Sequence, residues 1–302
     1  MVNHIIILFC SPFGPARLFD LGSRCDDGEL VDRLATHEAA RVQLAIEGSI
    51  AALDEAGISL HVRRNFSTYA AIRRAYGDVH LNQAFDPKET RFGHDDFWLL
   101  AENHRGEAIA TFCLRRFVVE DFYAMIRSQA LWFSNSLPLV DPRFVVECAI
   151  PPFGGEISHG GGLWVREDHR GCSRLAIIMP RFARAIAFRC RPFDHDSGMI
   201  RNDPRDRSEI ADRKAVFMGK RVYGFARVHR FVDGWFPPDA CDAVLYLCHS
   251  TRVEALDSLV APYAILKGLQ HLEFRKGPFV YQHDELIDTQ TVGGKGQQQA
   301  RV

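Results

Sequence analysis

The chain has no apolar run long enough to cross a bilayer, no C-x-x-C pair of cysteines and no excess of either charge. A membrane-spanning helix takes about 20 consecutive apolar residues, and the run Ile5–Phe9 is far shorter, so we expect it to be a buried strand. The formal net charge of −1 favours neither nucleic acid nor an anionic membrane as a partner, because both usually require a concentrated basic surface. We therefore expect neither.

The sequence also lacks a signal peptide, an internal repeat and a pattern typical of a metal site. Its 8 cysteines are scattered, which indicates reduced thiols in a cytoplasmic protein. Cys241, Cys248 and His249 do not have the usual zinc-motif spacing, and the run Asp194–Asp196, which contains a histidine, has no second cluster beside it. The sequence thus predicts no bound metal.

The chain of 302 residues has the composition of an ordinary globular protein, with 47% apolar and 25% charged residues. It is therefore long and apolar enough to bury a sizeable core. We expect an N-terminal extension packed on the core over residues 1–57, a main domain over residues 58–250 and a C-terminal helical segment over residues 251–288. Residues 289–302 are rich in Gly and Gln, have nothing to bury, and are predicted to be disordered.

Apolar spacing predicts the elements of this main domain and its flanks. The pattern Val118–Leu139 is rich in aromatic residues and predicts a helix packed on the core, with an aromatic-lined acceptor pocket as the alternative. The clearest sequence signal for a β-hairpin in the chain is formed by Phe97–Glu102 and Ala108–Phe117. The other predicted strands are Ile58–Val62 and Met199–Ile200. Four further helices are predicted over Glu29–Ala56, Phe66–Tyr76, Ser173–Cys190 and Val253–Leu272, and a fifth begins at Ser208. Gly57 is expected to end the first of these helices, and Pro180 lies inside the third.

The stretch from Glu156 to Cys190 carries the clearest functional pattern. Leu163–Val165 is a short strand candidate, Arg166–Ser173 is a polar loop, and helical spacing begins at Leu175. A loop that enters a helix N-terminus presents unpaired N–H groups, which suit a phosphate, and nearby arginines add positive charge. An ordinary strand-to-helix connection with solvated charges fits these residues equally well.

The loop sequence supplies a resemblance. After the strand that ends at Val165, the run Arg170–Ala176 reads Arg-Gly-Cys-Ser-Arg-Leu-Ala. It resembles the acyl-CoA site of the GNAT superfamily of acyl-CoA-dependent N-acyltransferases, in which a strand is followed by an Arg/Gln-x-x-Gly-x-Gly/Ala loop that opens a helix. Ser173 stands where the family usually has Gly, and Leu175 where it has Gly or Ala. A Cβ at these two places narrows the space for a diphosphate.

A second patch resembles a later motif of the same family, in which a helix ends at a Gly-Phe pair and two antiparallel strands follow. Here Gly224 and Phe225 lie within Arg221–Val228, and a further strand candidate follows at Asp242–Cys248. Gly224 suits the end of a helix, where a positive φ is often needed. The two motifs come in the family's order.

The resemblance implies a mixed α/β fold in which a mostly antiparallel, twisted sheet is flanked by helices, with a helical extension at the N-terminus. It also implies a co-substrate, acetyl-CoA or another acyl-CoA, an acceptor that is a small primary amine, and no metal. The oligomeric state is open, with a homodimer as one option. The residues that the resemblance assigns to acyl-CoA are Leu163, Trp164, Val165, Arg170, Gly171, Cys172, Ser173, Arg174 and Leu175.

Acyl transfer from a thioester to an amine needs a base for the amine proton and an acid for the leaving thiolate. The base candidates are Glu156 and His159, which precede the strand, with a surface carboxylate and a satisfied histidine as the structural alternative. The family often places its acid, a tyrosine, where this chain has Lys220; Tyr223 is the nearest candidate, with core packing as the alternative. Cys172 as a nucleophile is weighed against an ordinary small loop residue.

Two other functions fit the same sequence. A degenerate acyltransferase fold could act as a non-catalytic binding or regulatory protein, which Ser173, Leu175, Pro180 and the missing tyrosine favour. Acyl transfer from a carrier protein is the other, since it would make a diphosphate cradle dispensable.

Overall fold

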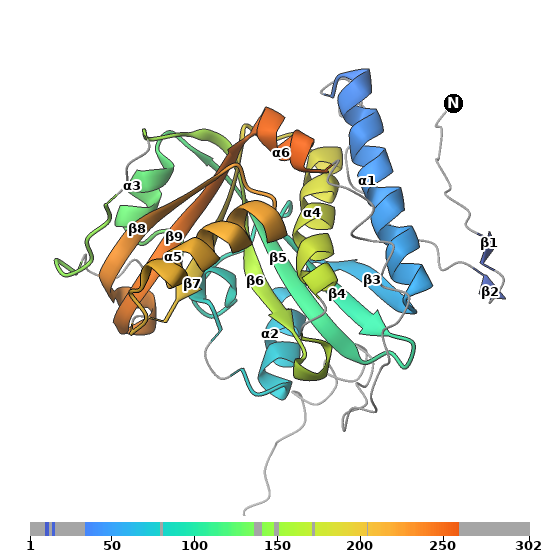
Figure 1. Cartoon of the computed structure of the whole chain (residues 1–302), viewed down its shortest axis with the longest axis horizontal. Helices are drawn as coiled ribbons and strands as arrows, with labels where there is room; N and C mark the ends of the chain where they lie inside the picture. The colour runs from blue at the N-terminus through green and yellow to red at the C-terminus, as the bar shows by residue number, and fades with distance from the viewer. Residues whose placement is uncertain are drawn as a thin grey trace, which may run out of the picture.

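The computed structural model of the chain describes residues 10–11, 14–15, 34–78, 81–135, 141–147, 151–170, 173–203 and 205–259 (Figure 1). The strand expected at Ile5–Phe9 and the tail expected after residue 288 lie outside these residues. Two very short antiparallel strands, β1 (Cys10–Ser11) and β2 (Gly14–Pro15), precede the rest. No helix in the described part of the chain is long and apolar enough to span a membrane.

One seven-stranded sheet organises the fold, with strand order β3-β4-β5-β6-β7-β9-β8. All neighbouring strands are antiparallel except β6 and β7, which are parallel. The mixed, mostly antiparallel sheet expected from the sequence is thereby confirmed. The strands are β3 (Ile58–Arg63), β4 (Phe97–Asn103), β5 (Ala108–Val119), β6 (Gly155–Val165), β7 (His195–Asn202), β8 (Arg227–Phe236) and β9 (Cys241–Thr251).

Helices cover both faces of this sheet, because successive strand residues point to opposite sides. Phe97 and Leu99 of β4 share a core with α1 and α4, while Trp98 and Leu100 share another with α2 and α3. The helix α5 packs on Val244 and other alternate residues of β9. The helices are α1 (Thr36–Glu55), α2 (Phe66–Ala75), α3 (Phe122–Arg127), α4 (Ser173–Cys190), α5 (Glu209–Phe217), extended by a π-helical turn (Met218–Val222), and α6 (Arg252–Leu259).

The parallel pair of strands depends on α4. Parallel neighbours cannot be joined by a tight turn, so a crossover segment must carry the chain back along the sheet. The helix α4 is that crossover, and in Figure 1 it lies beside α1 and below α6. It runs from the end of β6 to the start of β7, with Pro180 inside it, over the residues that its sequence predicts.

Several predicted helix ends are confirmed by local chemistry. Gly57 follows α1 with φ +67°, and Gly224 follows the π-helical turn with φ +78°, conformations that favour glycine. Ser208 caps α5 by accepting a hydrogen bond from the amide of Ala211. The α2 cap is Asn65, which accepts from the amides of Ser67 and Thr68.

The helix predicted over Val118–Leu139 is wrong in extent. Val118 and Val119 continue β5, and the only helix within the described part of this segment is α3, six residues long. Asp121 caps its start, and Gln129 adopts φ 64° just after its end, which a helix cannot continue through. The aromatic side chains behind the prediction, such as Trp132, are buried in the core.

Other boundaries also differ from the prediction. The strand expected at Leu163–Val165 begins at Gly155, because its polar and glycine-rich first half pairs with both β5 and β7. Met199–Ile200 is the middle of the longer β7, and α1 begins only at Thr36. After Gly224 and Phe225 come the two antiparallel strands β8, from Arg227 to Phe236, and β9, which contains the predicted Asp242–Cys248. The helix predicted over Val253–Leu272 is described only as α6, up to Leu259.

Candidate functional site

The pairing of β6 with β7 ends in the middle of the sheet. Their parallel ladder runs only from Ile157, paired with His195, to Gly160, paired with Gly198. Beyond this point β6 continues to Val165 and β7 to Asn202 without pairing to one another. All six residues 160–165 are partly exposed, although the strand is central and the sheet is covered on both faces. The second half of β6 is therefore unpaired on the side of β7 and reaches the surface.

Glycines form the last pair of this ladder because aromatic rings occupy the space where their side chains would lie. A Cβ on Gly160 would lie 2.7 Å from the ring of Phe112, and one on Gly198 would lie 3.0 Å from the ring of Phe225. Real Cβ atoms are hardly ever that close to another atom, so neither position tolerates a side chain without movement of the ring. The Gly-Gly-Gly run of the sequence is thus explained by packing and by a bulge.

The bulge lies at Gly162, which has φ +60°. The register between β5 and β6 shifts between Thr111 and Cys113, so that β6 holds one extra residue there. Arg73 of α2 fixes the bulge, because its Nη1 donates to the carbonyl of Gly162 at 2.9 Å and to the hydroxyl of Tyr69 at 2.9 Å. The bulge redirects the last residues of β6 toward the loop that follows.

That loop engages several of its own amides. The amide of Arg166 donates to the carbonyl of Ile109 at 2.8 Å, that of His169 to Arg166 at 2.9 Å, and that of Arg170 to Glu167 at 3.1 Å. These three donors are used inside the protein. Gly171 and Cys172 lie outside the described residues, as does the side chain of Ser173. Any anion site of this loop therefore depends on amides from Gly171 onward.

The residues that the sequence assigns to acyl-CoA differ in how exposed their side chains are. Leu163, Trp164 and Val165 line the open half of β6, and Arg174 is partly exposed on the first turn of α4. Arg170 is exposed, and its Nε donates to the carbonyl of Val165 at 3.1 Å. Leu175 is fully buried in the core, so only its backbone could contribute to a ligand site.

An ion-pair cluster makes the loop rigid. Nε of the buried Arg166 donates to Asp168 at 2.7 Å, and its Nη1 donates to Glu107 at 3.2 Å. Nδ1 of His169 lies 2.7 Å from the same carboxylate of Asp168. Burial alone would raise the pKa values of Asp168 and Glu107, but hydrogen bonds from Arg166 and their other partners hold both below the ordinary range. The approach to α4 is thus preorganised.

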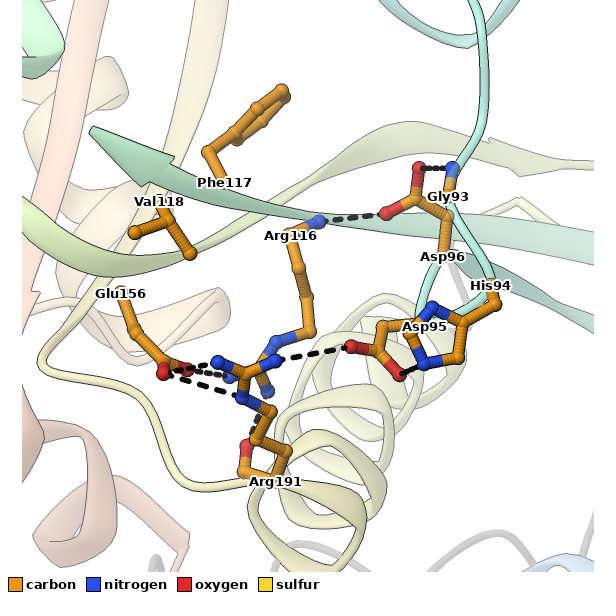
Figure 2. Close-up of a pocket in the computed structure, with 9 residues that line it drawn as sticks. All are labelled: Gly93, His94, Asp95, Asp96, Arg116, Phe117, Val118, Glu156 and Arg191. Atoms are coloured by element: carbon orange, nitrogen blue, oxygen red, sulfur yellow. Dashed lines mark hydrogen bonds and ion pairs between the residues drawn. The ribbon is translucent and has the colours of Figure 1, made fainter. Parts of the chain in front are cut away.

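Glu156 lies at the other end of β6 and points into a small pocket (Figure 2). One carboxylate oxygen accepts from Arg116 at 2.8 Å, and the other accepts from Arg191 at 2.5 Å. Val165 lies nine positions after Glu156, about 30 Å along an extended strand. The predicted base therefore stands far from the predicted anion site.

The charges of this pocket compensate one another. Arg116 also donates to the carbonyl of Pro192 at 2.9 Å and to that of Arg191, so it caps the end of α4. Burial lowers the pKa of Arg116, an effect that its hydrogen bond to the Glu156 carboxylate opposes. Asp95 lies 3.7 Å from Arg191 and 3.0 Å from His94. The pocket is a structural junction of β5, β6 and α4 rather than a site with unused charge.

His159 lies one residue before the end of the β6–β7 ladder, on the opposite face of the sheet from Glu156, since residues three apart on a strand point to opposite sides. It is 2% exposed, stacks on Phe85 with ring centroids 6.1 Å apart, and places its Nδ1 2.9 Å from the hydroxyl of Ser197. Burial, with a smaller effect of the Arg115 charge, lowers the pKa of His159 to about 3. The imidazole is therefore neutral at physiological pH.

Ser197 was missed by the sequence analysis. It stands one residue before the last ladder pair, and its hydroxyl also donates to the carbonyl of Ser158 at 3.2 Å. No local pattern marks it, because only the parallel register of β6 and β7 brings it to His159.

Tyr223 lies on the face of the sheet that α4 covers. It is partly buried, and burial, assisted by nearby Cys248, raises the pKa of its phenol. Arg184 of α4 binds its carbonyl at 3.2 Å and forms a buried pair with Asp196 of β7 at 2.6 Å. The three predicted catalytic residues thus occupy three separate places: Glu156 at the junction of β5, β6 and α4, His159 in the core near the end of the β6–β7 ladder, and Tyr223 on the face that α4 covers.

Among the described residues, no group of three or more His, Cys, Asp or Glu side chains is placed to hold a metal ion. The cysteines with described side chains, Cys113, Cys190, Cys241 and Cys248, form no disulfide. His195 and His249 do meet, with Nδ1 of the first 2.9 Å from Nε2 of the second.

Comparisons with known proteins add little to this geometry. Neither the known protein families nor the curated proteins contain a match to the chain. A crystal structure of a candidate phosphinothricin N-acetyltransferase aligns with 64% of this chain and 98% of its own, at 10% identity and a TM-score of 0.31. We base no functional inference on a likeness of that degree.

Proposed function

We propose that this protein is an N-acyltransferase that moves an acyl group, acetyl in the first instance, from acyl-CoA to the primary amine of a small acceptor. One observation carries the proposal. The only parallel strand pair of the described sheet ends at Gly160 and Gly198, and β6 continues unpaired on that side to Val165, shortly before α4 begins at Ser173. This is the arrangement that the resemblance to the GNAT superfamily implies for an acyl-CoA site.

In this proposal the donor lies along β6. The backbone of the partly exposed residues Leu163–Val165 would pair with the amide groups of the pantetheine arm, as one strand pairs with another. The diphosphate would lie at the N-terminus of α4, where orphan amides and the helix dipole favour an anion. Arg170 and Arg174 would add charge there. The thioester would then lie near Gly160 and Gly198, where the ladder of β6 and β7 ends.

The reaction would join the amine nitrogen to the thioester carbon and break the C–S bond, with one proton leaving the amine and one reaching the thiolate. Of the two base candidates, His159 lies next to the end of the β6–β7 ladder, and its neutral imidazole could accept a hydrogen bond from the amine. Both carboxylate oxygens of Glu156 are engaged by arginines at the far end of the strand, which does not favour it as a base. Tyr223 would act as the acid only from the other face of the sheet.

Binding and turnover separate the alternatives. Acetyl-CoA that binds the folded chain must raise its melting temperature by mass action, and release of free thiol with a panel of small primary amines would measure transfer. Arg170→Ala is expected to weaken donor binding more than it changes the KM for the amine. No rise in melting temperature at a millimolar dose would contradict the proposal.

A non-catalytic binding protein is the second candidate, and a specific observation favours it. The face of the sheet around His159 is filled by buried aromatic side chains, among them Phe85, Phe122 and Trp132, where an acceptor would need room. A chain that binds acetyl-CoA but transfers to no amine would support this reading. Transfer from a carrier protein remains the third, and would appear as turnover with an acylated carrier but not with acyl-CoA.

A further inference from the structure

We infer that the outer face of α5 and of the π-helical turn after it binds the surface of an anionic phospholipid bilayer. This face, the α5 surface, consists of six exposed residues: Ile210, Arg213, Lys214, Phe217, Lys220 and Arg221. The inference goes beyond the proposed function and does not depend on it, because none of the six belongs to the candidate functional site.

The apolar side chains of α5 are arranged opposite to what packing in a core requires. Its inner face is formed by Ala211 and Ala215, which are 6% and 1% exposed, and the helix lies with this face on β7 and β9 (Figure 1). The larger Ile210 and Phe217 are 69% and 59% exposed. They are seven positions apart, so they lie on the same side of the helix, two turns from one another. Since helices of soluble proteins normally bury their large apolar side chains, the core does not explain these two.

The charges around these two side chains are of one sign. Residues 213–221 contain four basic residues, all exposed, and no Asp or Glu. The nearest carboxylates are engaged, because Glu209 pairs with Arg213 at 3.6 Å and Asp212 accepts a hydrogen bond from Arg230. The dipole of α5 favours cations at its C-terminal end, but it accounts for neither exposed apolar side chain. The α5 surface therefore combines protruding apolar groups with positive charge.

This combination matches a bilayer that contains anionic lipids. Aromatic and aliphatic side chains enter the boundary between headgroups and acyl chains, while Lys and Arg extend their long stems so that the charged ends stay with the phosphates. Each basic residue close to an anionic membrane surface strengthens the attachment. A protein partner would have to offer a fitted socket for each protruding side chain, whereas a bilayer accepts both on the convex side of a helix without a fixed shape.

The net charge of the chain conceals this surface. The formal value of −1 includes the four cations of the α5 surface, which carboxylates elsewhere in the chain offset. A membrane attracts charges mainly within a Debye length, about 8 Å at physiological ionic strength. The local charge of the α5 surface, and not the net charge, therefore decides whether a bilayer binds there.

Co-sedimentation of the full chain with lipid vesicles tests the inference. Vesicles of phosphatidylcholine with about 30% phosphatidylglycerol are expected to bind the wild type about ten-fold more tightly than vesicles of phosphatidylcholine alone, and added salt should weaken this binding. Phe217→Ser and Lys220→Glu should each reduce it several-fold. Val253→Ser is the control for the first, because Val253 is 65% exposed but stands beside Glu254. Lys88→Glu is the control for the second, since it makes the same change of net charge at an exposed lysine outside the α5 surface.

Each outcome bears on the inference. Failure of the wild type to bind the anionic vesicles, or equal binding to both kinds of vesicle, would overturn it, and so would equal losses in the variants and their controls. Self-association that needs no lipid and disappears in Phe217→Ser, with no binding to vesicles, would assign the α5 surface to a second copy of the chain. If Phe217→Ser fails to fold, the comparison of Lys220→Glu with Lys88→Glu decides. Acyl transfer is measured without vesicles, so the proposed function stands or falls separately.

Discussion

The guanidinium of Arg116 lies 2.8 Å from the carboxylate of Glu156 and joins the end of β5 to the beginning of β6. Only 8% of the Arg116 side chain and 25% of the Glu156 side chain are exposed. Since Arg191 binds the other oxygen of the same carboxylate, Glu156 is shared between two arginines. Its role in the fold is therefore measurable apart from any role in catalysis.

We expect Glu156→Gln to lower the free energy of unfolding by about 1–3 kcal/mol, because it leaves the buried Arg116 without its ionic partner. Urea denaturation measures the loss. Glu209→Gln is the matched control: Glu209 is 80% exposed and pairs with Arg213 one helical turn away, so the change should cost less than about 0.5 kcal/mol. Equal losses in the two variants would show that the junction does not hold β6.

The stability of the protein should fall in mild acid through His159. Burial holds its pKa at about 3 in the folded state, whereas an unfolded histidine titrates near about 6.5. Between these two pKa values the unfolded chain binds a proton at His159 that the folded chain does not bind. The contribution of the neutral imidazole to the free energy of unfolding is therefore complete above about pH 6.5 and is lost as the pH falls toward about 3. The expected slope is about 1.4 kcal/mol per pH unit.

The measurement compares urea unfolding at pH 7, 6 and 5 for the wild type and for His159→Gln, which cannot take up a proton. The variant should lose less stability over this range, whatever its stability at pH 7. His94→Gln, at a side chain 83% exposed, should keep the wild-type pH dependence. Parallel pH profiles for the wild type and His159→Gln would rule out a buried neutral imidazole.

The glycine pair at the end of the β6–β7 ladder, Gly160 and Gly198, should not tolerate an added methyl group. Gly160→Ala places a Cβ against the ring of Phe112 and is expected to cost about 1–3 kcal/mol. Gly93→Ala is the control, because the nearest atom to its Cβ would be 3.9 Å away. Thermal and urea unfolding would measure both.

A double-mutant cycle makes this prediction specific. Phe112→Leu should recover part of the loss caused by Gly160→Ala, since the two residues are in contact and their effects should couple. Strictly additive losses would mean that the alanine acts on the backbone and not on the ring.

The rigidity of the loop before α4 can be tested through Asp168. We expect Asp168→Asn to weaken its pairing with both Arg166 and His169, and so to loosen the loop that presents α4. If the proposed function holds, the Kd for acetyl-CoA should rise several-fold with no equal change in the KM of the amine. Asp203→Asn, at an exposed pair with Arg205, should leave the donor Kd unchanged. An unaltered Kd in Asp168→Asn would separate loop rigidity from donor binding.

Local patterns in the sequence were enough for the elements that strong signals mark. The hairpin of β4 and β5, the helix α4 and the helix ends at Gly57 and Gly224 follow from alternation, apolar spacing and the need for positive φ. The first half of β6 was missed because Glu156 and Ser158 are polar. Their burial or pairing depends on Arg116 and on β7, which are distant in the sequence.

The candidate site could be predicted only in part, for the same reason. The strand, loop and helix order around Val165 is local, so the sequence reveals it. The separation of Glu156 from His159 follows from strand alternation once β6 is known to start at Gly155. The contact of His159 with Ser197 and of Phe225 with Gly198 requires the register of two strands joined by a long crossover.

The short ladder between β6 and β7 divides the sheet into two blades, four strands from the first part of the chain and three from the second. Four residue pairs form the whole seam between these blades, so bending there disturbs few hydrogen bonds compared with bending anywhere else in the sheet. The blades nevertheless share one core, because Trp98 and Leu100 of the first blade belong to the same buried cluster as Leu245 and Leu247 of the second. The angle between the blades is therefore held by the packing of side chains on that face more than by strand pairing.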